Sequence, residues 1–132
     1  MADTDRGPTV ADLQGTWTGE VRFTAGPLAG DLHPESWLLA DDGLLVHLRS
    51  RRGVGEWTSE GDELTFMFYE VLVDDARKPN GVVLITARAT LGPDRSTFEA
   101  VGRGDVYGLG GELLASNDTA ARGWRADRVE IP

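Results

Sequence analysis

The sequence predicts an all-β fold, a single closed antiparallel barrel of about eight strands with up-and-down connections. Segments in which apolar and polar residues alternate run from Thr16 to Val129, and a period of two is typical of strands. Turn signals such as Asp42–Gly43 and Gly61–Asp62 separate these segments. No segment carries a sustained apolar period of 3.6 residues, so no helix is expected that could cover an open sheet. Closing into a barrel is the simplest way for such a chain to remove its exposed strand edges.

The chain is predicted to form one domain, a barrel spanning residues 1–132 with a loosely ordered N-terminal segment at residues 1–12. Its 132 residues are enough to bury roughly two-thirds of the unfolded surface without disulfides or metals. The sequence contains no Cys, which excludes disulfides, thiol nucleophiles and Cys-ligated metals.

Composition also restricts the partners and the location. The formal net charge of −9 repels phosphate backbones and argues against nucleic-acid binding. The sequence shows no secretion signal and no apolar stretch long enough to span a membrane. We therefore expect a cytoplasmic protein with no membrane partner. Lys78 is the one lysine among 13 basic residues, a bias typical of GC-rich bacterial genomes.

The first predicted strand opens with Gly15-Thr16-Trp17. A Gly-x-Trp at the head of an all-β chain of this length resembles the start of a lipocalin-like (calycin) barrel. The resemblance implies that Trp17 closes one end of the barrel and that the hollow inside holds a small molecule. It also implies that a basic residue late in the chain, Arg125 or Arg128, packs over Trp17.

The second and third strands are predicted to form a hairpin around Asp42–Gly43. Read as a two-residue turn, this dipeptide pairs Trp37 with Leu48, so that Trp37 faces the interior and His47 faces solvent. His33 lies in a loop on the other side of the barrel, and neither histidine has a carboxylate at ligand spacing. We therefore expect no metal site and no cofactor.

The next hairpin places a carboxylate in the core. The Gly61–Asp62 turn pairs Trp57 with Phe66 and puts Phe68 and Glu70 on the same inward face. A buried carboxylate either takes a hydrogen-bonding partner or keeps its proton, and both outcomes suit acid–base chemistry or recognition of a ligand. The alternative is that Glu70 lies at the barrel mouth in water or forms a structural ion pair with an arginine of the last strand.

The later strands supply a second polar candidate. The Gly92–Arg95 loop pairs Ala89 with Phe98, and the turn after it sets Gly102 beside Asn117. An inward Asn117 can both donate and accept hydrogen bonds; alternatively, it is a turn residue that binds the local backbone. The last strand admits several registers.

The inferred interior has a bulky aromatic wall opposite a wall of Ala and Gly. This leaves either a ligand-sized cavity or strands packed close together. Trp124, if it points inward, brings Arg122 to its side; Trp57 and Trp124 are alternatively plain core residues. The side chains predicted to contact a ligand are Trp37, Trp57, Phe66, Phe68, Phe98, Trp124 and Arg122.

These features predict an enzyme without a cofactor, a cyclase or isomerase of a hydrophobic, polyketide-like molecule held inside the barrel. In fold and size the chain resembles bacterial allene oxide cyclase-like proteins and the barrel cyclases of polyketide pathways. Glu70 would act as acid or base and Asn117 as its hydrogen-bonding partner, in a water-poor cavity. The alternative is a carrier or sensor that binds such a ligand without turnover.

One further row of residues predicts self-association. Met67, Tyr69, Val71 and Val73 lie on the outer face of their strand, where a monomer should present polar groups. We expect a homodimer that covers this row.

Overall fold

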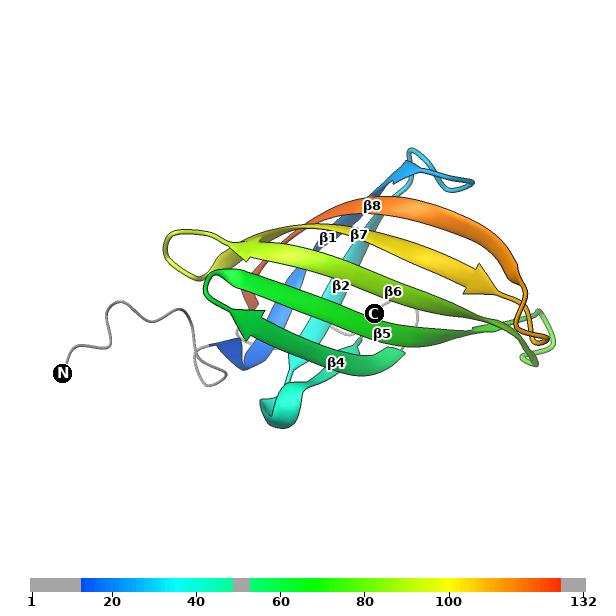
Figure 1. Cartoon of the computed structure of the whole chain (residues 1–132), viewed down its shortest axis with the longest axis horizontal. Helices are drawn as coiled ribbons and strands as arrows, with labels where there is room; N and C mark the ends of the chain where they lie inside the picture. Colours follow the sequence, from blue (N-terminus) through cyan, green and yellow to red (C-terminus); the bar gives the residue numbers. More distant parts are fainter. Residues whose placement is uncertain (1–12, 49–52, 127–132) are drawn as a thin grey trace.

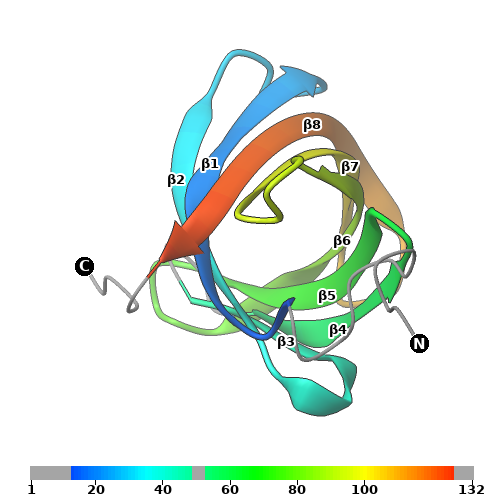
Figure 2. The ribbon, with the colours of Figure 1, turned by 90° about the vertical axis from the view of Figure 1, so that its left-hand side faces the viewer.

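The computed structural model describes residues 13–48 and 53–126, which form a closed eight-stranded antiparallel barrel with up-and-down connections. Each strand pairs with its neighbours along the chain, and β8 returns to pair with β1 (Figures 1 and 2). The predicted fold class is confirmed. The elements are β1 (Gly15–Ala25), β2 (Leu32–Leu39), the 3₁₀ turn η1 (Asp41–Gly43), β3 (Leu44–His47), β4 (Gly53–Glu60), β5 (Glu63–Val73), β6 (Pro79–Leu91), β7 (Thr97–Tyr107) and β8 (Leu113–Ala126).

The β4–β5 hairpin has the register that its turn residues predict. Trp57 pairs with Phe66, and Gly55 pairs with Phe68. Because side chains alternate between the two faces of a strand, this register puts Glu70 on the inward face of β5, where it is buried. The inward orientation predicted for Glu70 is confirmed.

The β2–β3 hairpin differs from the prediction by one residue. The turn uses three residues rather than two, with Asp42 and Gly43 both at positive φ, so Trp37 pairs with His47 instead of Leu48. A slip of one residue moves every side chain of a strand to its other face. The expectation that His47 faces solvent is therefore wrong: His47 and Leu45 point inward and are buried.

The β6–β7 and β7–β8 hairpins differ from the prediction by two residues. Ala89 pairs with Ala100 rather than Phe98, and Asn117 pairs with Gly104 rather than Gly102. An even shift leaves each side chain on its predicted face. Phe98 and Asn117 are accordingly both buried.

The register of β8 is fixed by its pairing with β1. Gly19 lies opposite Gly123 on the inner face, so the neighbouring Trp124 points outward and is 43% exposed. Arg122 is also on the outer surface, where its guanidinium binds the Glu20 carboxylate at 2.6 Å. The inward orientation considered for Trp124 and Arg122 is therefore wrong.

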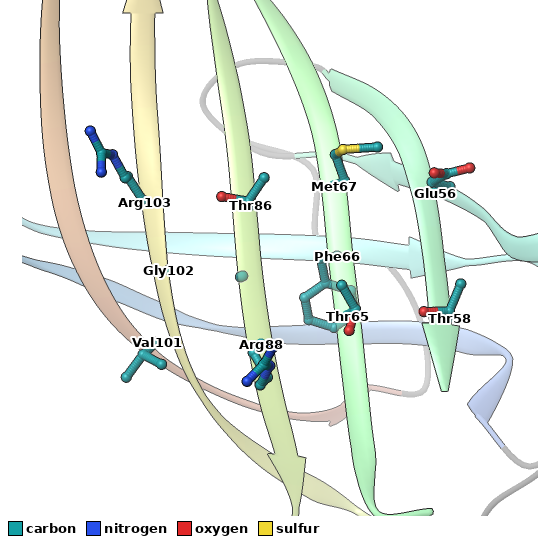
Figure 3. A pocket seen from close by; sticks show the side chains of 11 residues that line it. Glu56, Thr58, Thr65, Phe66, Met67, Thr86, Arg88, Val101, Gly102 and Arg103 are labelled. Atoms are coloured by element: carbon teal, nitrogen blue, oxygen red, sulfur yellow. The ribbon is translucent and has the colours of Figure 1, made fainter. Parts of the chain in front are cut away.

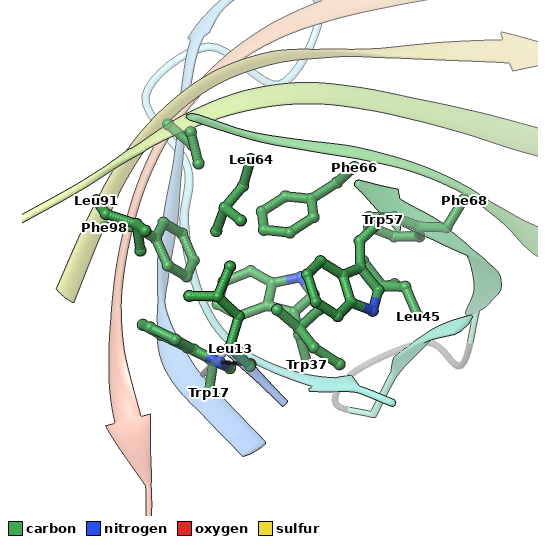
Figure 4. Close-up of a cluster of buried hydrophobic side chains, with 13 residues drawn as sticks. Leu13, Trp17, Trp37, Leu45, Trp57, Leu64, Phe66, Phe68, Leu91 and Phe98 are labelled. Carbon is green, nitrogen blue, oxygen red and sulfur yellow. Dashed lines mark hydrogen bonds between the residues drawn. The ribbon is translucent and has the colours of Figure 1, made fainter. Parts of the chain in front are cut away.

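The end of the barrel that contains Trp17 is closed and densely packed (Figure 4). The Trp17 indole N–H donates to the Leu13 carbonyl at 3.1 Å. The Arg125 guanidinium lies 4.9 Å from the centre of the indole ring and donates to the Gln14 carbonyl at 2.8 Å. Of the two basic residues considered, Arg125 is thus the one that packs over Trp17; Arg128 and residues 1–12 lie outside the described residues.

The opposite half of the interior is less filled. Several of its inward-facing side chains are only half-buried, whereas Val83 and Asn117 are buried. The packed half, by contrast, contains four ring–ring contacts, each of which involves Phe98 or Trp37. The half-buried inward residues are Val21, Phe23, Leu72, Ile85, Val106, Ala115 and Ala121.

Candidate functional site

Three titratable side chains from three strands meet on the inner face of the barrel. The His47 imidazole of β3 has its Nε2 2.9 Å from Glu35 Oε1 of β2 and its Nδ1 2.7 Å from Glu70 Oε1 of β5. Glu35, His47 and Glu70 are 8%, 4% and 7% exposed. Charged side chains are seldom buried this fully without partners. We call these residues the Glu35–His47–Glu70 cluster.

The alternation of the strands and one glycine bring the cluster together. β3 and β5 are not neighbours, because β4 lies between them. Gly53 of β4 pairs with His47 on one side and with Glu70 on the other. A Cβ at Gly53 would lie 2.6 Å from the Tyr69 carbonyl oxygen, 3.0 Å from Glu70 Cγ and 3.2 Å from the Phe68 ring. The missing side chain therefore leaves the space across which His47 and Glu70 meet.

Two aromatic rings enclose the imidazole. Trp37 stacks on His47 with a centroid separation of 6.2 Å and an interplanar angle of 22°, and Phe68 lies at 5.1 Å. Aromatic faces favour a cation close to them, and they limit the access of water. The cluster is thus a charged group set into an aromatic wall.

The surroundings of His47 decide its protonation. Burial acts to lower the pKa, because the charged ring loses hydration. The hydrogen bonding and the charges of Glu35 and Glu70 outweigh this effect and raise the pKa of His47 from 6.5 to about 9. At neutral pH the cluster therefore contains an imidazolium held between two carboxylate side chains.

The arrangement does not suit a metal ion. The two carboxylates contact opposite nitrogens of the ring, so the three groups face one another instead of a common point. Within residues 13–48 and 53–126 no group of three or more His, Asp or Glu side chains has a geometry that would hold a metal.

The other predicted site residues lie in three places. Asn117 is buried away from the cluster, and its Oδ1 accepts a hydrogen bond of 2.9 Å from the Leu28 amide in the β1–β2 connection. Arg122 and Trp124 are on the outer surface, and so they do not line the interior. The aromatic residues predicted to form the wall all belong to the buried core: Trp37, Trp57, Phe66, Phe68 and Phe98.

Sequence reasoning found Glu70 but missed both of its companions. His47 was assigned to the wrong face by the one-residue slip in the β2–β3 turn. Glu35 shares the inward face of β2 with Trp37 and Leu39, so the alternation that identified Trp37 as a core residue could also have identified Glu35. The signal was an acidic residue at the same alternate positions of the strand as the apolar residues.

No protein-family model matches the chain, and neither the curated proteins nor the solved structures yield a significant match. The fold therefore defines the class by itself: a closed eight-stranded antiparallel barrel, consistent with a lipocalin-like barrel. Among the described residues, no helix has the length and apolar character needed to cross a membrane.

Proposed function

We propose that the protein is an isomerase or cyclase without a cofactor, which acts on a hydrophobic, polyketide-like small molecule inside the barrel. The observation that carries this proposal is the buried Glu35–His47–Glu70 cluster on the inner face of the barrel. Proton-transfer groups set in water-poor surroundings are typical of enzyme sites.

In the proposed reaction, Glu70 takes a proton from a carbon of the substrate and returns it at another position. His47 holds the Glu70 carboxylate in place through Nδ1, and Glu35 holds His47 through Nε2. The proton removed is the proton returned, so an isomerisation balances without a redox partner. For a cyclisation, the same groups polarise the substrate while the walls fold it into a reactive shape.

The walls near the cluster suit a flexible apolar substrate. Phe68 and Trp37 present aromatic surface beside the charged groups, whereas Ala115 and Ala121 on the opposing strand are small and half-buried. In this proposal the substrate enters through the less filled half of the barrel and reaches the cluster from that side. The scarcity of lysine, one among 13 basic residues, fits a bacterial protein, and a cytoplasmic location is part of the proposal.

The proposal can be tested with a model substrate that loses a proton from carbon to any suitably placed base. 5-Nitrobenzisoxazole opens its ring when a base removes its C–H proton, and the phenolate formed is coloured. We expect Glu70→Gln to reduce the catalysed rate by about 100-fold or more, the usual contribution of a positioned base. The matched control is Glu63→Gln, because Glu63 is an exposed residue of the same strand. Equal rates for Glu70→Gln and Glu63→Gln would contradict the proposal.

A carrier or sensor of a hydrophobic ligand is the second candidate. The observation in its favour is that both ring nitrogens of His47 lie against carboxylates. If the role of these contacts is structural, the barrel holds a ligand without turnover. Binding of the neutral apolar dye 1-aminoanthracene distinguishes the two. A carrier binds the dye and shows no turnover dependent on Glu70, whereas the enzyme shows both binding and turnover.

A further inference from the structure

The outer surface of β4–β7 carries apolar side chains that are exposed to solvent. They include the predicted row on β5, and they continue onto the strands on either side through paired residues such as Val54 and Tyr69. Large contiguous apolar patches on a soluble protein mark interaction sites. The exposed members are Val54 (57%), Met67 (38%), Tyr69 (51%), Val71 (55%) and Val73 (56%); we call this surface the β5 face, and Val101 (66%) lies beside it on β7, beyond Arg88.

The β5 face has a hollow beside a ridge. The hollow has a volume of about 530 Å³, and the outward side chains around it include Glu56, Thr86 and Arg103 (Figure 3). Thr65 and Met67 line it from β5. Further along the same strand Tyr69 and Val71 stand out from the surface. Hollow and ridge therefore follow one another along β5.

We propose that the β5 face is the interface of a homodimer in which the Tyr69 ridge of each copy fills the hollow of the other. A twofold axis across the strands, between the levels of Met67 and Tyr69, places each ridge over the partner's hollow. Such an interface is isologous, because each contact occurs twice with the partners exchanged. This inference is independent of the proposed function.

One pair of charges on the face is self-complementary under the same axis. Arg103 and Asp105 are successive outward residues of β7, joined within the chain at 2.7 Å, and they lie level with Met67 and Tyr69 through the strand pairing. The axis puts Arg103 of one copy opposite Asp105 of the other. Two copies of a chain with a net charge of −9 repel one another in general, so contact is favoured where acids and bases alternate.

The outline of the face limits what a partner can cover. Four strands spaced about 4.8 Å apart span about 19 Å, and the 11 residues of β5 span about 36 Å at about 3.3 Å each. The product of about 700 Å² is a maximum, because these strands form half of a closed barrel, so the interface belongs to the small size class. A closed barrel has no free strand edge, so the association must proceed through side chains of such a face.

Sedimentation velocity tests the proposal. The wild-type protein should sediment as a dimer, with twice the 14.3 kDa mass of one chain. Tyr69→Glu should raise the dissociation constant of this dimer by about tenfold or more. Leu32→Glu is the matched control, since Leu32 is equally exposed but lies on β2. Tyr69 is a surface residue, so its substitution should leave the barrel folded, which circular dichroism checks.

The paired charges give a second measurement. Arg103→Asp alone or Asp105→Arg alone should weaken the dimer, because each sets like charges opposite one another. The double variant should restore it. A wild-type protein that stays monomeric at about 100 µM, far above the dissociation constant of a micromolar interface, would overturn the proposal. So would a Leu32→Glu variant that dissociates as readily as Tyr69→Glu.

Discussion

His47 is the residue whose environment differs most from that of the same side chain in water. It is buried, lies between the Glu35 and Glu70 carboxylates, and is stacked against Trp37. Its charged form is favoured because two nearby negative groups outweigh the loss of hydration. The protonation of one ring is therefore coupled to the folding of the barrel.

This coupling predicts how stability depends on pH. The pKa of His47 is raised in the folded state, from 6.5 to about 9, so its contribution is fully present below pH 6.5 and is lost as the pH rises through about 9. The difference corresponds to on the order of 3 kcal/mol. Urea unfolding at pH 6.5 and at pH 9.5 should show a decrease of this size. In His47→Gln the decrease should largely disappear; the same decrease in that variant would show that other groups cause it.

A second prediction concerns the space between His47 and Glu70. Gly53→Ala places a methyl group against the Tyr69 carbonyl oxygen as well as against Glu70 and Phe68, so β4 and β5 should move apart and the contact between imidazole and carboxylate should lengthen. The pKa of His47, followed by NMR titration of the ring protons, should fall from about 9 towards 6.5. Gly104→Ala is the control, because its Cβ would meet Val83 at an ordinary 3.5 Å. An unchanged titration in Gly53→Ala would mean that the glycine does not set this contact.

At the scale of elements, closure of the barrel depends on the seam between β1 and β8. Gly19 and Gly123 face each other across this seam. A Cβ at Gly19 would overlap the Arg122 carbonyl oxygen, and one at Gly123 would lie 2.5 Å from the Phe98 ring. The two glycines thus let the first and last strands approach each other while Phe98 packs over them.

We accordingly expect Gly19→Ala to lower the free energy of unfolding by about 3 kcal/mol, in the range of overpacked cores. Gly104→Ala, also in a strand and buried, should change it by less than about 1 kcal/mol. Urea denaturation of both variants measures the difference. Similar values for the two would show that the seam relaxes to accept a methyl group.

The hairpins show which part of a register the sequence can specify. Gly61–Asp62 forms a turn whose length follows from its residues, and every pair expected in β4–β5 occurs. At Asp41–Gly43 two turn lengths are compatible with the same residues, because Asp tolerates positive φ almost as Asn does. The longer turn places His47 against Trp37 and buries Leu45, so packing in the assembled barrel selects it.

At the scale of the whole molecule, the barrel combines a closed end with a more open one. Arg125 links the last strand to the first by covering Trp17 and binding the Gln14 carbonyl. Arg125→Ala should therefore lower the free energy of unfolding by about 1–2 kcal/mol, from one cation–π contact and one hydrogen bond. Arg125→Lys should recover part of it, since a lysine keeps the charge but not the planar guanidinium. A thermal melt compares the three proteins, and equal midpoints would show that this contact does not contribute.

The sequence by itself determined the fold class, the inward face of β5 and the buried position of Glu70. These follow from local information: alternation with a period of two and turns whose length their residues specify. The tertiary structure alone decided that Glu35 and His47 join Glu70, that Arg125 covers Trp17, and that Trp124 faces solvent. The physical reason is that these contacts join strands distant in sequence, and their register is set by packing around the closed barrel rather than by any single hairpin.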